Sequence, residues 1–431
     1  MDPFLEQAER HLLQEICTVT GSSFQRQARL LLMSDSGLTA RQIGTELGLS
    51  RSGVYYWVRR FRLRRMSIFD SFKKTDANSL SGKTVTEARA NPESENLSTR
   101  GTAGKKDSLP FPDLRKSAGI QVEETLAETG RKILLFHFAQ MIQHEPGTIL
   151  GEDIEALHDM RVATRRMRAA MDLFADTFKP KVIKPFLKDL RQTGRALGKV
   201  RDLDVFIEKV HHYLQSLPET ERQGLDSLLN TWFEQRNRQR ISMMEYLESP
   251  AYKEFKRTFN LFLQTPGAGV RARSSHAPES HLVRQVAPVL LYTRLAAVNA
   301  YDDILPTATI PQLHSLRIEL KRLRYALEFF GEVMGPQTKL VINEIKRLQD
   351  HLGDLNDADG ACHLLADILS NWDNQYSSIS LAERPAPNPV IAFLAYRAQE
   401  RHRLLVSFPS AWENFTRPEI HQNFALAIAE M

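Results

Sequence analysis

The segment LHDMRVATRRMRAAMDLF at 157–174 aligns without a gap with LHSLRIELKRLRYALEFF at 313–330, which begins 156 residues later. A second pair of segments, LGKVRDLDV at 197–205 and LGDLNDADG at 352–360, is offset by 155 residues. Two separate blocks that repeat with almost the same spacing indicate an internal duplication. We therefore predict two similar helical bundles related by pseudo-symmetry.

Both copies of the first block have the spacing of an amphipathic helix. Apolar residues recur at three and four here and through the rest of the chain beyond about residue 118, and no stretch shows the two-residue alternation of a strand. The predicted fold class is all-α. The expected packing face consists of Met160, Ala163, Met167, Ala170, Met171 and Phe174 in the first copy, and of Leu316, Leu320, Leu323, Leu327 and Phe330 in the second.

The opposite face of each predicted helix is cationic. At about 100° per residue, four basic positions fall within about 80° of one another in each copy. They are His158, Arg161, Arg165 and Arg168 in the first copy and His314, Arg317, Lys321 and Arg324 in the second, flanked by Arg166 and Arg322. Later helices add Lys188, Arg191 and Arg195 before the first LG, and Lys346 and Arg347 before the second.

Like charges at this spacing repel one another by a few tenths of a kcal/mol per pair. The sequence offers little local compensation, because there is no acid between 160 and 171 and only Glu319 between 316 and 327. A multivalent anion would offset the repulsion, since Arg forks bind phosphate oxygens bidentately. The alternative is that each row is an ordinary solvated helix face, but its occurrence in both copies favours a ligand site.

The pattern H-x-x-R-[VI]-x-x-[RK]-R-x-R, followed about 35 residues later by L-G-x-x-[RN]-D-x-D, occurs twice and resembles the CHAD domain family over roughly 118–431. The resemblance implies a pair of four-helix bundles around a basic central channel that binds inorganic polyphosphate without catalysis and without a cofactor. The binding residues it implies are His158, Arg161, Arg165, Arg166, Arg168, Arg191, Arg195, His314, Arg317, Lys321, Arg322, Arg324, Lys346 and Arg347.

Two departures weaken the symmetry of this pattern. Asn356 stands where the first copy has Arg201, and Asp350 stands where it has Arg195. We expect the second bundle to bind more weakly along its later helix. The two histidines would add a pH-dependent donor, and the alternative for each is a helix-start residue satisfied by backbone groups.

The acidic pairs Asp202/Asp204 and Asp357/Asp359 follow the LG motifs. Residues i and i+2 on a helix point apart, so capping or pairing with a nearby Arg is favoured over a metal site, and no metal is expected. His158 and Asp159 spell the doublet of metal-dependent phosphohydrolases, but the second copy reads His314 and Ser315. Such a hydrolase acting on phosphate chains is the alternative function, and a granule-associated scaffold is a third.

The N-terminal region contains LTARQIGTELGLSRSGVYYWVRRFR at 38–62, which has the features of a helix-turn-helix. Thr39 would cap a helix that runs to Leu47, Gly48 would lie in the turn, and 24–34 would supply a helix that packs across the pair. The region resembles the homeodomain-like fold of transposase and resolvase DNA-binding regions.

DNA contacts are expected along the second helix of this motif. Six arginines and no acid occur between 51 and 65, which favours a nucleic-acid partner over a helical dimerisation module. The predicted DNA-binding residues are Arg51, Ser52, Tyr55, Tyr56, Arg59 and Arg60, and Arg59, Arg60, Arg62, Arg64 and Arg65 form a basic exit suited to phosphates.

Composition fits a soluble, folding protein, with 42% hydrophobic and 25% charged residues. The two cysteines are far apart, and the sequence has no secretory signal and no apolar stretch of roughly 20 residues. These features predict a cytoplasmic protein without membrane insertion. Its expected ligands would associate it with polyphosphate granules or the nucleoid. The predicted domains are a helix-turn-helix domain at 1–70, a flexible linker at 71–117, a first bundle at 118–263, a connection at 264–281 and a second bundle at 282–431.

Overall fold

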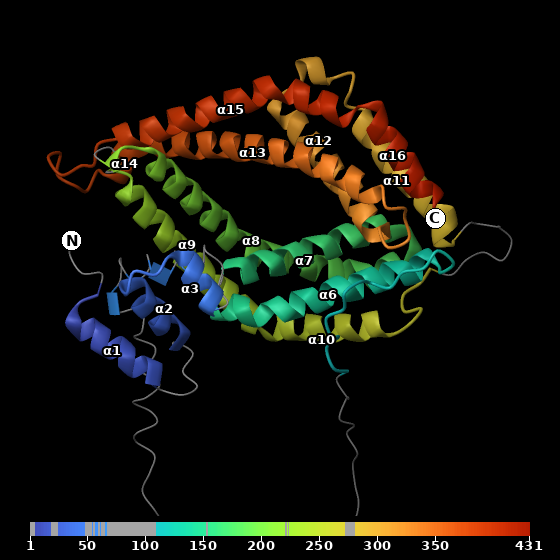
Figure 1. Cartoon of the computed structure of the whole chain (residues 1–431), viewed down its shortest axis with the longest axis horizontal. Helices are drawn as coiled ribbons and strands as arrows, with labels where there is room; N and C mark the ends of the chain where they lie inside the picture. The colour runs from blue at the N-terminus through green and yellow to red at the C-terminus, as the bar shows by residue number, and fades with distance from the viewer. Residues whose placement is uncertain are drawn as a thin grey trace, which may run out of the picture. The chain divides into compact units, whose positions relative to one another are not determined.

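Helices form nearly all of the regular structure of this chain (Figure 1). The computed structural model describes residues 5–18, 25–47, 54, 57–58, 61, 65–66, 109–151, 154–219, 222, 224–271 and 281–431. Within these ranges there is no strand, only two isolated bridges, and no helix is long and apolar enough to cross a membrane. The all-α prediction is confirmed.

The N-terminal part contains three described helices, α1 (Gln7–Thr18), α2 (Gln25–Asp35) and α3 (Ala40–Leu47). Thr39 caps α3: its backbone N–H donates to Oε1 of Gln42 at 2.9 Å, and the N–H of Gln42 donates to Oγ1 of Thr39 at 3.4 Å. This reciprocal arrangement is a capping box, so the predicted start of the helix is confirmed. The helix ends at Leu47, as predicted. The buried core of this part consists of Leu5, Leu13, Ile16, Ala28, Leu30, Leu31, Ile43, Val54, Trp57 and Phe61.

The remainder of the chain from residue 109 contains two sets of helices in the same order. The first set is α6 (Leu126–Leu150), α7 (Ile154–Leu173), α8 (Pro180–Ser216), α9 (Asp226–Glu248) and α10 (Pro250–Gln264). The second set is α11 (Val283–Asn299), α12 (Ile310–Phe330), α13 (Thr338–Ser370), α15 (Asn388–Phe415) and α16 (Pro418–Ala429), with the single-turn α14 (Trp372–Gln375) between α13 and α15.

Each set differs from the expected four-helix bundle because its fourth helix is interrupted. Pro250 begins α10 directly after α9, and Ser249 caps the new helix by accepting a hydrogen bond from the N–H of Tyr252. Pro418 begins α16 in the equivalent place after α15. Proline lacks the N–H that a continuing helix needs but fits the first turn of a new one, so the chain bends at both points.

The repeated helices α7 and α12 bury the faces that the sequence assigned to packing. Every residue of the predicted face, from Met160 to Phe174 and from Leu316 to Phe330, is at most 2% exposed. Phe174 and Phe330 occupy the same position in the two copies, and their ring centroids lie 5.9 Å apart at an interplanar angle of 76°. Equivalent residues that touch each other lie on the axis that relates two copies, so the duplication has produced a pseudo-two-fold arrangement.

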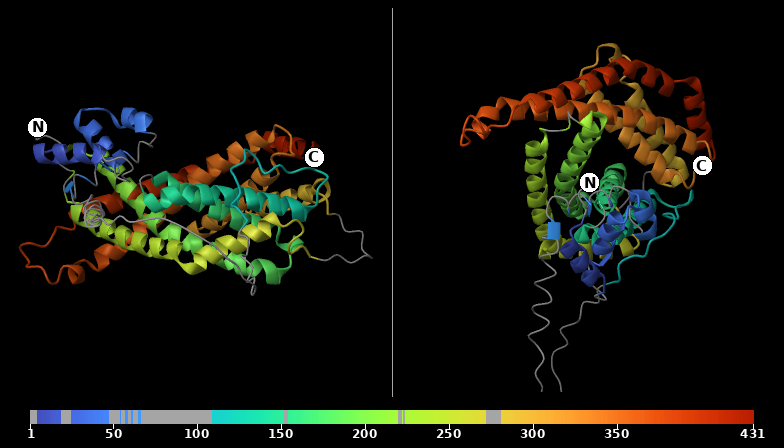
Figure 2. Two further views of the ribbon diagram at one scale, coloured as in Figure 1. Left: turned by 90° about the horizontal axis from the view of Figure 1, so that it is seen from below. Right: turned by 60° about the vertical axis from the view of Figure 1, so that its left-hand side comes forward.

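The two halves are also joined at the far ends of their long helices. Side chains of α8, α9, α13 and α15 share one apolar cluster, in which Tyr213 lies 4.8 Å from Phe393 between ring centroids. In Figure 1 α13 and α15 run side by side, and Figure 2 shows α8 and α9 reaching the same end of these helices. The cluster consists of Ile207, Val210, Tyr213, Leu225, Leu228, Leu229, Trp232, Leu365, Val390 and Phe393.

The segment from 109 to 120 lies against the helices although it has no regular structure of its own. The Asn260 amide donates to the carbonyl oxygens of Leu109 and Pro110 at 2.9 and 3.1 Å. The Glu332 carboxylate accepts the backbone N–H groups of 118, 119 and 120. Residues 109–117, which the sequence assigned to the linker, therefore belong to the folded body.

Candidate functional site

Basic side chains of α7 and α12 gather at the centre of the duplicated region. Burial and then the charges of four neighbouring arginines lower the pKa of Lys321 to about 8. These arginines come from both copies, so the two rows predicted from the sequence converge. We call Arg161, Arg165, Arg317, Lys321 and Arg324 the basic cluster.

Tyr325 brings the arginines of the two copies close together. The guanidinium carbon of Arg165 lies 5.8 Å from the centroid of its buried ring, and that of Arg324 lies 5.2 Å from it. An aromatic face attracts cations, which offsets part of the cost of placing two guanidinium groups together. Burial and the charges of neighbouring arginines nevertheless lower the pKa of Arg165.

Glycines on α8 and α13 make room for two arginines of the basic cluster. A Cβ atom at Gly198 would lie 3.6 Å from Nε of Arg161, and a Cβ atom at Gly353 would lie 3.4 Å from Nη2 of Arg317. These are the glycines of the two LG motifs. The repeated LG is visible in the sequence. Only the structure shows its physical reason, which is that a guanidinium group contacts the helix backbone at each of these glycines.

The cations of the cluster differ in their counterions. Nη2 of Arg161 lies 3.1 Å from Oδ1 of Asp202, and Nη1 of Arg324 lies 3.4 Å from Oε1 of Glu328. Within the described residues, no carboxylate lies within 4.0 Å of Arg165, Arg317 or Lys321. The Nε atoms of Arg165, Arg317 and Arg324 are buried and have no hydrogen-bond partner among these residues. Buried donors of this kind are costly to leave unpaired, so the cluster has capacity for an anion.

Arg166 and Arg322, like Arg161 and Arg324, take part in ion pairs. Nη2 of Arg166 lies 2.9 Å from Oε2 of Glu328, while Arg322 pairs with Glu319 and lies 4.0 Å from Asp172. The sequence placed both arginines among the anion ligands. The structure places both in ion pairs, while Nε of Arg166 is buried without a hydrogen-bond partner among the described residues, so their role as anion ligands stays a prediction.

The outlying predicted cations form two groups. Partial burial and the charges of Arg191, Arg195 and Arg161 lower the pKa of Arg168, so the exposed arginines of α8 lie near the cluster. In the second copy Lys346 and Arg347 are exposed, and Arg347 pairs with Glu344 at 2.6 Å. The structure thus connects the α8 arginines to the cluster and gives no such connection for the α13 residues.

The two predicted histidines lie at the starts of their rows. His158 is on α7, three residues before Arg161. His314 is exposed, and its Nδ1 lies 2.6 Å from Oδ1 of Asn356. Asn356 is the residue that replaces the arginine of the first copy, so this departure from symmetry supplies a partner for the imidazole.

Comparison with known proteins identifies the duplicated region. A model of the CHAD domain matches residues 132–366, which is more than half of the chain. The chain belongs to the CHAD domain family. A model of the homeodomain-like domain matches residues 22–66, so the chain combines a CHAD domain with a homeodomain-like helix-turn-helix module.

A solved structure of a CHAD domain shows the same fold. The crystal structure of the CHAD domain from the plant Ricinus communis matches with a TM-score of 0.55 and 23% sequence identity, covering 70% of this chain and 96% of that one. PptA from Streptomyces chartreusis matches with a TM-score of 0.48 and 17% identity, covering 67% of this chain and 100% of that one. No curated protein matches the sequence.

The acidic pairs of the CHAD domain hold cations of neighbouring helices. Asp204 forms a buried ion pair with Arg236, and its equivalent Asp359 lies 3.0 Å from Nη1 of Arg401. Asp357 lies 3.2 Å from Nζ of Lys209. The predicted pairing role of these carboxylates is confirmed. In the described part of the chain, no three His, Cys, Asp or Glu side chains are grouped as metal ligands would be.

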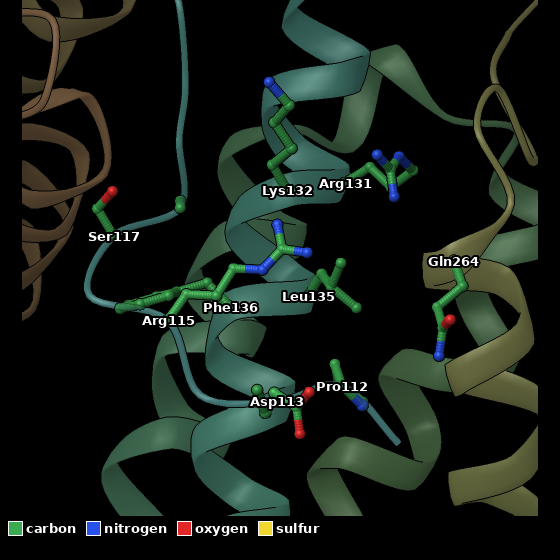
Figure 3. Close-up of a pocket in the computed structure, with 11 residues that line it drawn as sticks. Pro112, Asp113, Arg115, Ser117, Arg131, Lys132, Leu135, Phe136 and Gln264 are labelled. Carbon is green, nitrogen blue, oxygen red and sulfur yellow. The ribbon is translucent and has the colours of Figure 1, made fainter. Parts of the chain in front are cut away.

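A cavity of about 260 Å³ lies beside α6 and is lined by no residue of the basic cluster (Figure 3). It forms where the segment 112–118 crosses α6, with Leu135 and Phe136 at its wall. Two of its cations are already neutralised, because Arg131 pairs with Glu128 and Lys132 with Glu124. None of the predicted site residues lines it.

The predicted DNA contacts of the homeodomain-like module lie outside the described residues. This applies to Arg51, Ser52, Tyr55, Tyr56, Arg59 and Arg60. Arg65 is described, and it forms an ion pair with Glu9 of α1. The sequence counted Arg65 in the basic exit for phosphates, whereas the structure gives it a partner within the module.

Proposed function

We propose that the CHAD domain binds inorganic polyphosphate in its basic cluster without cleaving it, and that the homeodomain-like module binds DNA. The observation that carries the proposal is the convergence of equivalent cations from both copies, three of which lack a carboxylate within the described residues. Several guanidinium groups facing a common point suit a ligand with many phosphate oxygens.

A linear phosphate chain fits this cluster better than duplex nucleic acid does. The cations lie between packed helices, and the major groove of DNA alone is about 12 Å wide. A single flexible strand carries a negative charge on each phosphate and can follow cations that alternate between α7 and α12. Membership in the CHAD domain family supports this choice, because resemblance to that family implies polyphosphate as the ligand.

The chemistry of the side chains in the cluster supports a role in binding without turnover. Arginine and lysine stabilise phosphate charge, but hydrolysis also needs a positioned water and a group that takes its proton. The carboxylate nearest to the cluster, Asp202, is held by Arg161 at 3.1 Å. We therefore assign the cluster to binding.

The central test compares Arg165→Ala/Arg317→Ala with Arg403→Ala/Arg417→Ala, a control of equal charge on exposed positions away from the cluster. Polyphosphate affinity should fall by about tenfold or more per cluster arginine, and the slope of log K against log salt should fall by about 0.7 for each lost contact. Unchanged affinity in the cluster variant, with the fold intact by circular dichroism, would remove the proposal.

A release assay tests the binding-only role. Polyphosphate incubated with the protein and Mg²⁺ or Mn²⁺ should yield no orthophosphate above a buffer control. Metal-dependent release would establish the phosphohydrolase alternative.

The DNA-binding role is tested separately. The full chain should bind duplex DNA with strong salt dependence, and Arg51→Ala/Arg59→Ala should weaken this binding while leaving polyphosphate affinity unchanged. If saturating polyphosphate alters DNA affinity, the two activities are coupled; equal DNA affinity with and without it means that the modules act independently.

A further inference from the structure

Helix α8 carries a row of six exposed cations, which includes Arg191 and Arg195 and extends beyond these two arginines in both directions. All six lie on one face, because at about 100° per residue they fall within an arc of about 80°. At 1.5 Å per residue the row is about 27 Å long. It consists of Lys181, Lys184, Lys188, Arg191, Arg195 and Lys199.

This row has no internal neutralisation. Within the described residues, none of the six side chains lies within 4.0 Å of a carboxylate. Their spacing of three and four residues places like charges on neighbouring turns, where each pair repels its neighbour. A polyanion lying along the row would remove this repulsion and release the counterions that the free row attracts.

The row is continuous with the basic cluster. Gly194 and Gly198 of α8 contact Arg168 and Arg161, since a Cβ atom at these positions would lie 3.4 and 3.6 Å from the guanidinium groups. Arg191 and Arg195 are on the next face of the same turns. Their charges contribute to the lowered pKa of Arg168, after burial as the first cause.

The fold itself does not require the row. In the second copy the equivalent positions are Pro336, just before helix α13, and Lys339, Asn343, Lys346, Asp350 and Asp354 on it, so two cations remain and two acids have appeared. The two helices have the same place in the duplicated architecture but opposite charge at their later positions. The α8 charges therefore serve something other than folding.

We propose that the α8 row is an outer track that binds the part of a long polyphosphate chain that extends out of the basic cluster. This inference rests on the proposed polyphosphate-binding function and adds a preference for long chains. Lysine suits an exposed track, because its ammonium group is a hydrated point charge that tolerates a mobile ligand, whereas the cluster relies on arginine forks. Single-stranded nucleic acid is less suitable, since its binding sites stack bases on aromatic side chains and the row contains none.

The experiment uses the full chain with tripolyphosphate and a long-chain polyphosphate as probes. The test variant is Lys181→Gln/Lys184→Gln/Lys188→Gln, and the control variant is Lys339→Gln/Arg403→Gln/Arg417→Gln, which changes the charge equally at exposed positions of the second copy. Glutamine has nearly the helix propensity of lysine and arginine, so the helices should persist.

The test variant should bind the long chain about tenfold more weakly, with a salt slope reduced by about 2, and should bind tripolyphosphate like the unmodified protein. The control should bind both probes normally. Equal long-chain affinity in the test variant and the unmodified protein would overturn the track while Arg165→Ala/Arg317→Ala still reports on the cluster. If the test variant also lost tripolyphosphate binding, the row would be part of the main site. If it lost DNA affinity but kept normal long-chain affinity, the row would be a nucleic-acid surface. Either result would also overturn the track.

Discussion

Arg166 of α7 and Glu328 of α12 form an ion pair, with Nη2 and Oε2 2.9 Å apart. The equivalent residues in the opposite copies are Arg322 and Asp172, which lie 4.0 Å apart. Reciprocal pairing of this kind is what a two-fold relation produces, because each copy offers the same two groups to the other. The duplication thus supplies both the basic cluster and the contacts that hold its two helices together.

The Arg166–Glu328 pair should contribute to stability more than to binding. Both side chains are partly buried, so the double-mutant cycle of Arg166→Ala and Glu328→Ala should give a coupling energy of about 1 kcal/mol in chemical denaturation. The Arg166→Ala variant should bind polyphosphate almost normally at temperatures where it is folded. A large loss of affinity in the folded variant, with no loss of stability, would instead assign Arg166 to the ligand.

We expect Asp202, which pairs with Arg161, to compete with the proposed ligand for this arginine. Removing this carboxylate by Asp202→Asn should raise polyphosphate affinity about threefold, because Arg161 then has no counterion at 3.1 Å to exchange. Asp303→Asn removes an exposed acid elsewhere in the domain and controls for the change in net charge. Equal increases in the two variants would mean that only net charge matters.

Lys321 should make polyphosphate affinity depend on pH. Its pKa of about 8 in the free protein rises when phosphate binds beside it, so affinity should be constant below pH 8 and fall by up to about tenfold per pH unit above it. Binding isotherms between pH 6.5 and 9.5 measure this. Lys321→Arg keeps the charge and should abolish the fall.

The same group should give the opposite trend in stability. The ordinary pKa of lysine is 10.5, so between about pH 8 and 10.5 the unfolded chain binds more protons than the folded one. The free energy of unfolding of the ligand-free protein should therefore gain a contribution that rises with pH across this window. Lys321→Met should remove that contribution. If the free energy of unfolding depended on pH in the same way in Lys321→Met and in the unmodified protein, Lys321 would be more hydrated than its surroundings indicate.

The repeated aspartates should differ in what their removal costs. Asp204 and Arg236 are almost completely buried, so Asp204→Ala removes a buried carboxylate that pairs with Arg236 and should lower the free energy of unfolding by about 3 to 5 kcal/mol. Asp359→Ala should cost less, because its partner Arg401 is 34% exposed and can be hydrated. Equal losses in urea denaturation would contradict the role of burial.

Patterns of neighbouring residues in the sequence were sufficient to predict the packing faces, the duplication and one helix cap of this molecule. The apolar residues at three and four fixed the packing faces of α7 and α12, and the repeat with offsets of 156 and 155 revealed the duplication. The cap at Thr39 and the end of its helix at Leu47 were also readable, because a capping box involves residues only three apart. Each of these features depends on neighbours in the sequence.

The sequence by itself determined the helical class, the two copies and the cationic face of each repeated helix, because these follow from periodicity and from aligned residues. Only the tertiary structure decided which cations are available to an anion. Arg166 finds a carboxylate on the opposite copy, and Arg322 pairs with Glu319 of its own helix, whereas Arg165, Arg317 and Lys321 find none among the described residues. A counterion such as Glu328, 162 positions from Arg166 in the chain, leaves no local signal, since ion pairing depends on distance in space.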